Sequence, residues 1–283
     1  MATISRRGFL RAARNMAIGG TLGALGLWRY VDFEATWFNL QHQLIKVPRL
    51  ANKLSGLKLV HLSDLHLNTS LTPEIFGTVV DLVNQQDADI IAITGDFIDK
   101  WTDLASVAEY GPQLSRLQAR FGTFAVLGNH DHREAPGLVR EMLLDSGITE
   151  LANRAEEIKI DNERLFVCGL DDYKYRKNDL EALLADFPEG ERGILLVHEP
   201  DYADISAVTS RFSLQLSGHS HGGQIHIPVV GPPLTPLYGR KYPRGLYEVE
   251  DMLLYTTTGI GTIPPFVRFN CRPEVALFTL LPA

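Results

Sequence analysis

The chain has 283 residues, of which 45% are hydrophobic and 22% are charged, so it is long enough for one large domain or two small ones. Its net charge is −7, and residues 1–30 contribute five arginines and no acid, which leaves −12 on the rest. An acidic body of this kind argues against a broad nucleic-acid-binding face. The two cysteines, Cys168 and Cys271, lie in strand-like apolar stretches, which favours buried free thiols over a disulfide.

Residues 1–30 have the features of a targeting segment. Ser5-Arg6-Arg7-Gly8-Phe9-Leu10-Arg11 resembles a twin-arginine export signal. The stretch Ala17–Leu27, diluted by four glycines, is too short and too weakly apolar for an ordinary membrane-spanning helix. A basic amphipathic helix is the alternative interpretation.

No Ala-x-Ala cleavage site occurs in residues 18–40, so the N-terminal segment can persist as a membrane tether. The resemblance to a twin-arginine signal implies export by that machinery as a folded protein. The expected location is the periplasm or the outer face of the inner membrane.

Residues 31–55 are expected to form a linker and a first strand, Gln43–Val47, and residues 56–283 the main domain. Apolar runs predict further strands at 57–62, 89–94, 124–127, 155–161, 164–169, 193–197, 212–217, 245–249, 252–257 and 275–280. Capping and proline signals predict helices at 73–84, after the N-cap Thr72, and at 104–117, 136–146 and 180–187. Strands and helices alternate in the first half, which is typical of an α/β fold.

Polar residues follow five of these strands directly, at the ends where α/β folds place their sites. In an extended segment, residues i and i+2 point to the same side. We therefore expect Asp64 and His66 to share one metal ion, and His219 and His221 to face the same cluster.

Three further residues complete this set. Asp96 is the natural bridge, because a carboxylate has two oxygens and enough charge to hold two cations close together. Asn129 offers a neutral oxygen, and His198 another nitrogen. Two divalent ions about 3.5–4 Å apart need roughly this many protein ligands. A nitrogen and oxygen set without thiolate suits Mn, Fe or Zn, and because imidazole must be neutral to bind, activity should fall below a pH of about 6.5.

Together these residues resemble the five motifs of the calcineurin-like metallophosphoesterases, in the family's order. The motifs are Asp64-x-His66, Gly95-Asp96-x-x-Asp99, Gly128-Asn129-His130-Asp131, His198 and Gly218-His219-Ser220-His221. Three later motifs resemble the exported bacterial YkuE/YaeI-like branch: Gly222-Gly223-Gln224, Gly245-Leu246-Tyr247 and Gly259-Ile260-Gly261-Thr262.

The resemblance implies a four-layer α/β fold, with a two-sheet β-sandwich flanked by helices. It also implies that one metal is held by Asp64, His66 and His221, the other by Asn129, His198 and His219, and that Asp96 bridges them. The implied activity is that of a metal-dependent phosphodiesterase, in which activated water attacks the phosphorus of a phosphodiester or phospholipid-type substrate in line.

His130 has no ligand role left, so we expect it to protonate the leaving oxygen while Asp131 orients its other ring nitrogen. A purely supporting role for His130 is the alternative, and Asp99 is expected to cap a helix or to support a ligand. Two other functions stay open: a pyrophosphatase of a lipid-linked nucleotide such as UDP-2,3-diacylglucosamine, and a non-catalytic metal-binding scaffold at the cell envelope.

Overall fold

The computed structural model describes residues 5–100 and 102–283, so residues 1–4 of the expected signal lie outside the described residues. Within these described residues, twelve strands form two mixed six-stranded sheets. The first sheet has the order β1 (Asn39–Val47), β12 (Glu274–Pro282), β2 (Lys58–Leu62), β3 (Ile90–Thr94), β4 (Thr123–Val126) and β5 (Thr149–Glu150). The second has the order β10 (Gly245–Val249), β11 (Met252–Thr256), β9 (Phe212–Ser217), β8 (Gly193–Leu196), β7 (Glu163–Gly169) and β6 (Arg154–Ile160).

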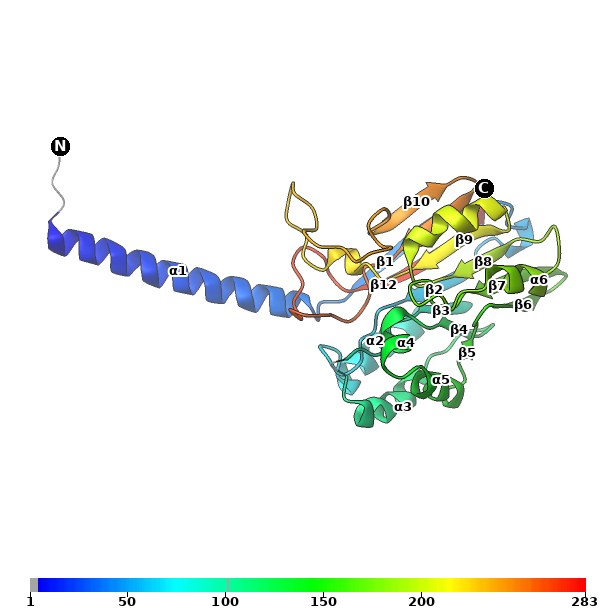
Figure 1. Ribbon diagram of the computed structural model, residues 1–283, viewed down its shortest axis with the longest axis horizontal. Coiled ribbons are helices and arrows are strands. Elements are labelled where there is room, and N and C mark those ends of the chain that lie inside the picture. The colour runs from blue at the N-terminus through cyan, green and yellow to red at the C-terminus, as the bar shows by residue number, and fades with distance from the viewer. Residues whose placement is uncertain (1–4, 101) are drawn as a thin grey trace.

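Helices cover the outer faces of the two sheets, except for α1, which extends away from the domain (Figure 1). They are α1 (Arg6–Glu34), α2 (Pro73–Asn84), α3 (Gly111–Leu114), α4 (Asn129–Glu134), α5 (Pro136–Asp145), α6 (Leu180–Asp186) and α7 (Ala203–Ser206). Short 3-10 turns occupy Asn52–Leu54, Leu104–Tyr110, Pro200–Tyr202, Ala207–Thr209 and His221–Gly223.

Three apolar clusters separate these layers. In β2, Val60 and Leu62 face the helices of the first half, whereas Leu59 faces the second sheet. A third cluster packs the outer face of the second sheet against α6 and α7, with Leu183 and Ala203 among its members. The order helix, sheet, sheet, helix confirms the expected four-layer α/β fold.

Most predicted elements are present, with bounds that shift by a few residues. The strand predicted from Gln43 begins earlier, at Asn39, and pairs in parallel with β12. The single helix predicted at 104–117 is wrong, because Leu104–Tyr110 is a 3-10 helix and only Gly111–Leu114 is α-helical. Pro112 lacks the backbone N–H that a continuous helix would require there. Both cysteines are free and buried, as expected.

Helix α1 extends away from the domain (Figure 1). It runs through Glu34, so residues 31–34, expected in a linker, are helical. Its C-terminal end is fixed to the domain, because Arg268 N donates to Val31 O and the buried Glu34 carboxylate accepts from Cys271 N. Within the described residues, no helix has both the length and the apolar character that crossing a bilayer requires.

Candidate metal centre

The predicted ligands meet at the carboxyl ends of strands from both sheets. Asp64 and His66 follow β2, Asp96 follows β3 and Asn129 follows β4. From the second sheet, His198 follows β8, and His219 and His221 follow β9. The side chains of this set of seven are all buried.

The backbone reason for this convergence differs from the expected one. Five of the seven residues have a left-handed backbone with φ between 42° and 66°, namely Asp64, His66, Asp96, His219 and His221. The segments after the strands therefore turn at these residues, and the expected extended backbone is wrong, although Asp64 and His66 do lie in one ligand group as expected. Non-glycine residues in this region cost of order 1–3 kcal/mol each, and such conformations cluster at functional sites.

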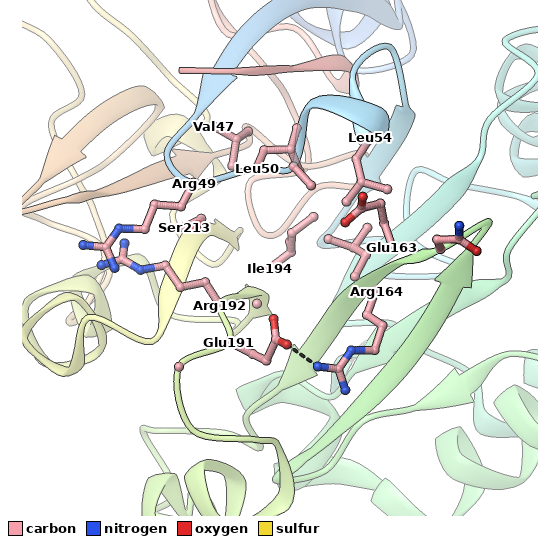
Figure 2. A pocket seen from close by; sticks show the side chains of 15 residues that line it. Val47, Arg49, Leu50, Leu54, Glu163, Arg164, Glu191, Arg192, Ile194 and Ser213 are labelled. Carbon is pink, nitrogen blue, oxygen red and sulfur yellow. Dashed lines mark hydrogen bonds and ion pairs between the residues drawn. The ribbon is translucent and has the colours of Figure 1, made fainter.

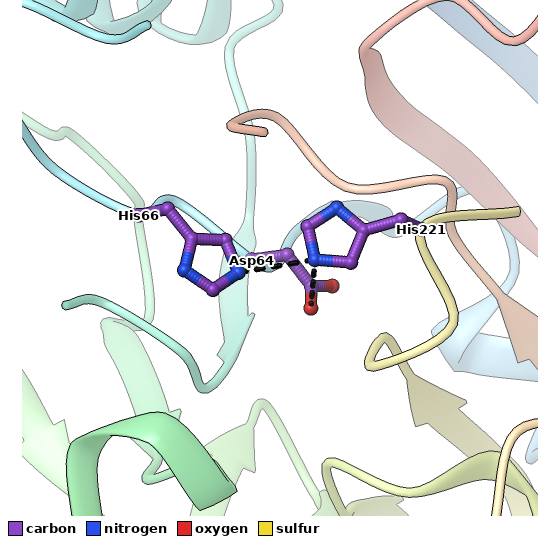
Figure 3. A group of neighbouring side chains, drawn as sticks. All are labelled: Asp64, His66 and His221. Carbon is purple, nitrogen blue, oxygen red and sulfur yellow. Dashed lines mark hydrogen bonds and ion pairs between the residues drawn. The ribbon is translucent and has the colours of Figure 1, made fainter. Parts of the chain in front are cut away.

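Asp64, His66 and His221 form the first ligand group (Figure 3). The Nε2 atoms of the two imidazoles face each other at 3.0 Å. The Asp64 Oδ1 atom lies 3.4 Å from His221 Nε2. The other ring nitrogen of His66, Nδ1, lies 3.5 Å from Asp99 Oδ2, so Asp99 supports a candidate ligand, one of its two expected roles.

Asp96, His198 and His219 form the second group. The Asp96 Oδ2 atom lies 3.1 Å from His198 Nε2 and 3.9 Å from His66 Nε2, so this carboxylate stands between the two groups. Asn129 is buried, and neither its amide oxygen nor its amide nitrogen has a hydrogen-bond partner within the described structure. A buried amide without partners fits a metal ligand, because leaving it unpaired is costly.

The hydrogen bonds of the second group leave ring lone pairs aimed at each other. His198 Nδ1 contacts Thr94 O at 2.6 Å, and His219 Nε2 contacts Leu237 O at 2.8 Å. A nitrogen that faces a carbonyl oxygen must donate, so in the neutral rings the remaining nitrogens carry lone pairs. These two atoms, His198 Nε2 and His219 Nδ1, are 3.2 Å apart. A cation bound between them would remove the repulsion between the two lone pairs.

Burial sets the charge state of most of these groups. It lowers the pKa of His66 and of His219 to about 3, which keeps both rings neutral and able to bind a metal. It raises the pKa of Asp64 to about 7. Burial alone would lower the pKa of His198 as well. The negative charge of the neighbouring Asp96 carboxylate has the larger effect and raises the pKa of His198 well above its usual value. A cation at this position would replace that proton.

Two glycines make room for the buried carboxylates. A Cβ at Gly218 would overlap the Asp64 carboxylate, and a Cβ at Gly128 would overlap that of Asp96. The strand ends therefore approach each other more closely than any residue with a side chain allows. Together with the converging lone pairs, this packing shows that the residues present fit divalent metal binding.

His130 and Asp131 do not interact as expected. Both Asp131 carboxylate oxygens accept backbone hydrogen bonds, one from Gly128 N and the other from Ile98 N. The ring Nδ1 of His130 instead lies 3.0 Å from a guanidinium nitrogen of Arg133. Asp131 therefore supports the turn that carries Asn129, and the expectation that it orients the His130 ring is wrong.

Sequence reasoning missed two basic residues that support the site. Arg133 could have been found from its i+3 spacing to His130, had residues 129–134 been recognised as a helix. Arg268 is completely buried, and its guanidinium donates to the carbonyls of Thr258, Gly259, Gly261 and Cys271. A lone arginine in an apolar loop was its only signal.

A separate pocket of about 350 Å³ lies at the opposite ends of the parallel strands (Figure 2). It is lined by the starts of β8 and β9 and by three arginines. Two of these are paired, Arg164 with Glu191 and Arg192 with Asp251. The candidate metal ligands are absent from its lining, so this pocket is not part of the metal centre.

Comparison with protein families gives a match over residues 57–223, more than half of the chain, to the model described as calcineurin-like phosphoesterase. The chain is 33% identical over 283 residues to the metallophosphoesterase YkuE of Bacillus subtilis, covering 99% of each chain. It is 31% identical to the phosphodiesterase YaeI of Escherichia coli, covering 98% of this chain and all of that one.

Among solved structures, the NAD nucleotidase of Haemophilus influenzae resembles this fold with a TM-score of 0.50 and 13% identity. The match covers 72% of this chain and 45% of that one. At this identity the likeness concerns the fold alone.

Proposed function

Because the chain belongs to the calcineurin-like phosphoesterase family and is a phosphoric ester hydrolase, we propose that it is a phosphodiesterase with a dinuclear metal centre. The observation that carries this proposal is the position of Asp96 between two groups of buried ligands. When bound there, two divalent cations (Mn, Fe or Zn) would acidify a water molecule and offset charge on the phosphoryl oxygens.

The roles of the protein's own residues follow from their contacts. The turns after the strands hold the buried ligands in place and exclude bulk water from them. His130 is more exposed than these ligands, and its ring lies 5.0 Å from that of His66. Because Arg133 donates to Nδ1, the neutral His130 ring carries its proton on Nε2. That proton is available to a leaving alkoxide or phenolate.

The test is hydrolysis of bis-p-nitrophenyl phosphate by purified protein, after chelation and again after addition of Mn²⁺. We expect turnover only with the metal, and faster turnover than with the monoester p-nitrophenyl phosphate. An Asp96→Asn variant should be inactive, whereas Asp81→Asn, on the exposed face of α2, should match wild type. Activity that is independent of metal, or a preference for the monoester, would contradict the proposal.

The same proposal extends to location. The motif Ser5–Arg11 supports export by the twin-arginine machinery, with the enzyme acting in the periplasm or at the outer face of the inner membrane. Replacing Arg6 and Arg7 together by lysine should leave the protein in the cytoplasmic fraction of cells that have this pathway. Unchanged export of that variant would remove the support for this route.

A further inference from the structure

An apolar pocket of about 300 Å³ opens directly beside the metal centre. His221, a candidate ligand, and Ser220 form one wall. The other walls are built from apolar side chains, among them Ile225, Leu234 and Ile263. The pocket is therefore an apolar space, suited to a hydrocarbon chain, directly next to the position where a phosphate would bind.

The segment that forms one side of the pocket is free of formal charge. Residues 222–239 contain no Asp, Glu, Lys or Arg, in a chain in which 22% of residues are charged. The apolar side chains at its tip are exposed, with Val229 completely exposed and Val230 exposed by 74%. A contiguous exposed apolar surface of this kind marks an interaction site.

Both ends of this segment contact candidate metal ligands. Leu237 O accepts from His219 Nε2, and at the other end Gln224 follows the ligand turn at His221–Gly223. The Gln224 side chain makes paired hydrogen bonds of 2.9 and 2.8 Å with the backbone of Ile263, which closes the floor of the pocket. The pocket is thus linked by direct hydrogen bonds to the segments that carry the candidate metal ligands.

Helix α1 approaches the domain at the same place. Phe269 connects the two, since its N donates to Gln224 O, its O accepts from His226 N and its ring contacts that of Tyr30. Figure 1 shows the 222–239 segment, coloured yellow to gold, on the side of the domain from which α1 extends. Arg7, Arg11 and Arg14 share one face of α1 at a spacing of four and three, which suits anionic lipid headgroups.

We propose that this pocket is a subsite for the hydrocarbon chain of a bilayer phosphodiester lipid, whose phosphate reaches the metal centre while the 222–239 tip and α1 contact the membrane. The inference rests on the proposed phosphodiesterase function. Adjacency to His221 favours a chain of the substrate itself over a separate partner. The arginines of α1 and the uncharged tip favour a bilayer as the source of that chain.

The first experiment uses soluble esters, p-nitrophenyl alkyl phosphates with ethyl, butyl, hexyl and octyl chains. For the wild-type enzyme we expect kcat/KM to rise by up to about fourfold per methylene until the pocket is filled. Leu234→Asp should flatten this dependence. Leu144→Asp, the same change at an exposed leucine of α5, should preserve it. A chain-length dependence that is flat in wild type would overturn the inference.

The second experiment tests the bilayer as the source. Full-length protein should co-sediment with vesicles of equal parts phosphatidylcholine and phosphatidylglycerol, and the double change Val229→Asp and Val230→Asp should weaken this binding at least tenfold relative to Leu144→Asp. Equal binding of the tip variant and of Leu144→Asp would overturn the assignment to a membrane lipid. The same samples are also assayed with bis-p-nitrophenyl phosphate. If they hydrolyse it but fail the tests above, the lipid inference is wrong and the proposed phosphodiesterase function stands.

Discussion

His130 differs from the ligand histidines around it in its surroundings. The ligand rings are buried, and those of His198 and His219 are oriented by backbone carbonyls, whereas His130 is partly exposed and paired with a guanidinium. A histidine that keeps the metals in place and one that delivers a proton should therefore respond differently to removal. Substrates whose leaving groups differ in their need for a proton distinguish the two roles.

We predict that His130→Ala retains its bound metal but loses about 10²–10⁴-fold in turnover of an ester with an alkyl leaving group. The loss should be smaller for a p-nitrophenyl ester, because p-nitrophenolate leaves without protonation. Metal analysis and kinetics on both substrates check this, with His42→Ala, an exposed histidine of β1, as control. Equal losses on both substrates would assign His130 a supporting role.

His61 shows how burial of one ionisable group couples stability to pH. It lies in β2 between the sheets, and its Nε2 pairs with Thr94 Oγ1 at 2.8 Å. Burial lowers its pKa to about 3, whereas in the unfolded chain it is about 6.5. As the pH falls, the unfolded state takes up this proton at a higher pH than the folded state does. The contribution of His61 to stability is therefore present above pH 6.5 and is lost as the pH falls toward 3.

We predict that the free energy of unfolding of metal-free wild-type protein falls more steeply between pH 6.5 and pH 4.5 than that of His61→Gln. The difference should approach about 1.4 kcal/mol per pH unit, the value for one proton. Urea unfolding in chelator at several pH values measures it, with His42→Gln as the matched control. Parallel pH profiles for wild type and His61→Gln would show that His61 is not the group responsible.

The loop 258–261 shows how a single buried side chain shapes the site. The Arg268 guanidinium donates hydrogen bonds to three carbonyls of this loop. The loop in turn donates from Gly261 N to Asp64 O at 2.7 Å and from Ile260 N to Ser63 O at 3.0 Å. Arg268 N also donates to Val31 O at the end of α1. The arginine therefore links α1, the loop and the turn that carries Asp64.

We predict that Arg268→Met lowers the free energy of unfolding by about 3–5 kcal/mol, because it removes the guanidinium that donates to four buried carbonyls. Metal affinity should also fall, by about 10–100-fold, since Asp64 loses its support. Arg116→Met, which removes the exposed ion pair with Asp81, should cost no more than about 1 kcal/mol. Calorimetry and metal titration compare the two variants, and similar small effects of both would contradict this role of Arg268.

Across the fold, the sequence predicts those features that depend on local pattern. The buried strands β3 and β8 are continuous apolar runs, and the N-cap Thr72 with Pro73 marks the start of α2 correctly. The turn conformation of Asp64 and of the other ligands could not be predicted, because side-chain periodicity does not report the sign of φ. Contacts such as Arg268 with the 258–261 loop depend on tertiary packing and leave no periodic signal.

The metal centre also joins the two sheets, since its ligands come from β2, β3 and β4 on one side and from β8 and β9 on the other. Cations bound there would therefore stabilise the whole domain and not only the turns. Linkage gives about 2.7 kcal/mol when the free metal is at 100 times its Kd. For a domain of this size, each 1 kcal/mol corresponds to about 2–4 °C in Tm.

We predict that chelation of the metal-loaded protein lowers its Tm by several degrees, and that added Mn²⁺ or Zn²⁺ restores it. Asp96→Asn keeps the shape of the side chain but removes the charge shared by both ligand groups, so the metal-dependent change in Tm should largely disappear. Asp81→Asn, on the exposed face of α2, should retain the full change. Differential scanning calorimetry of the three proteins, with and without chelator, measures these changes in Tm. If the metal-dependent change in Asp96→Asn equalled that of wild type, this carboxylate would not be the group that holds the two cations together.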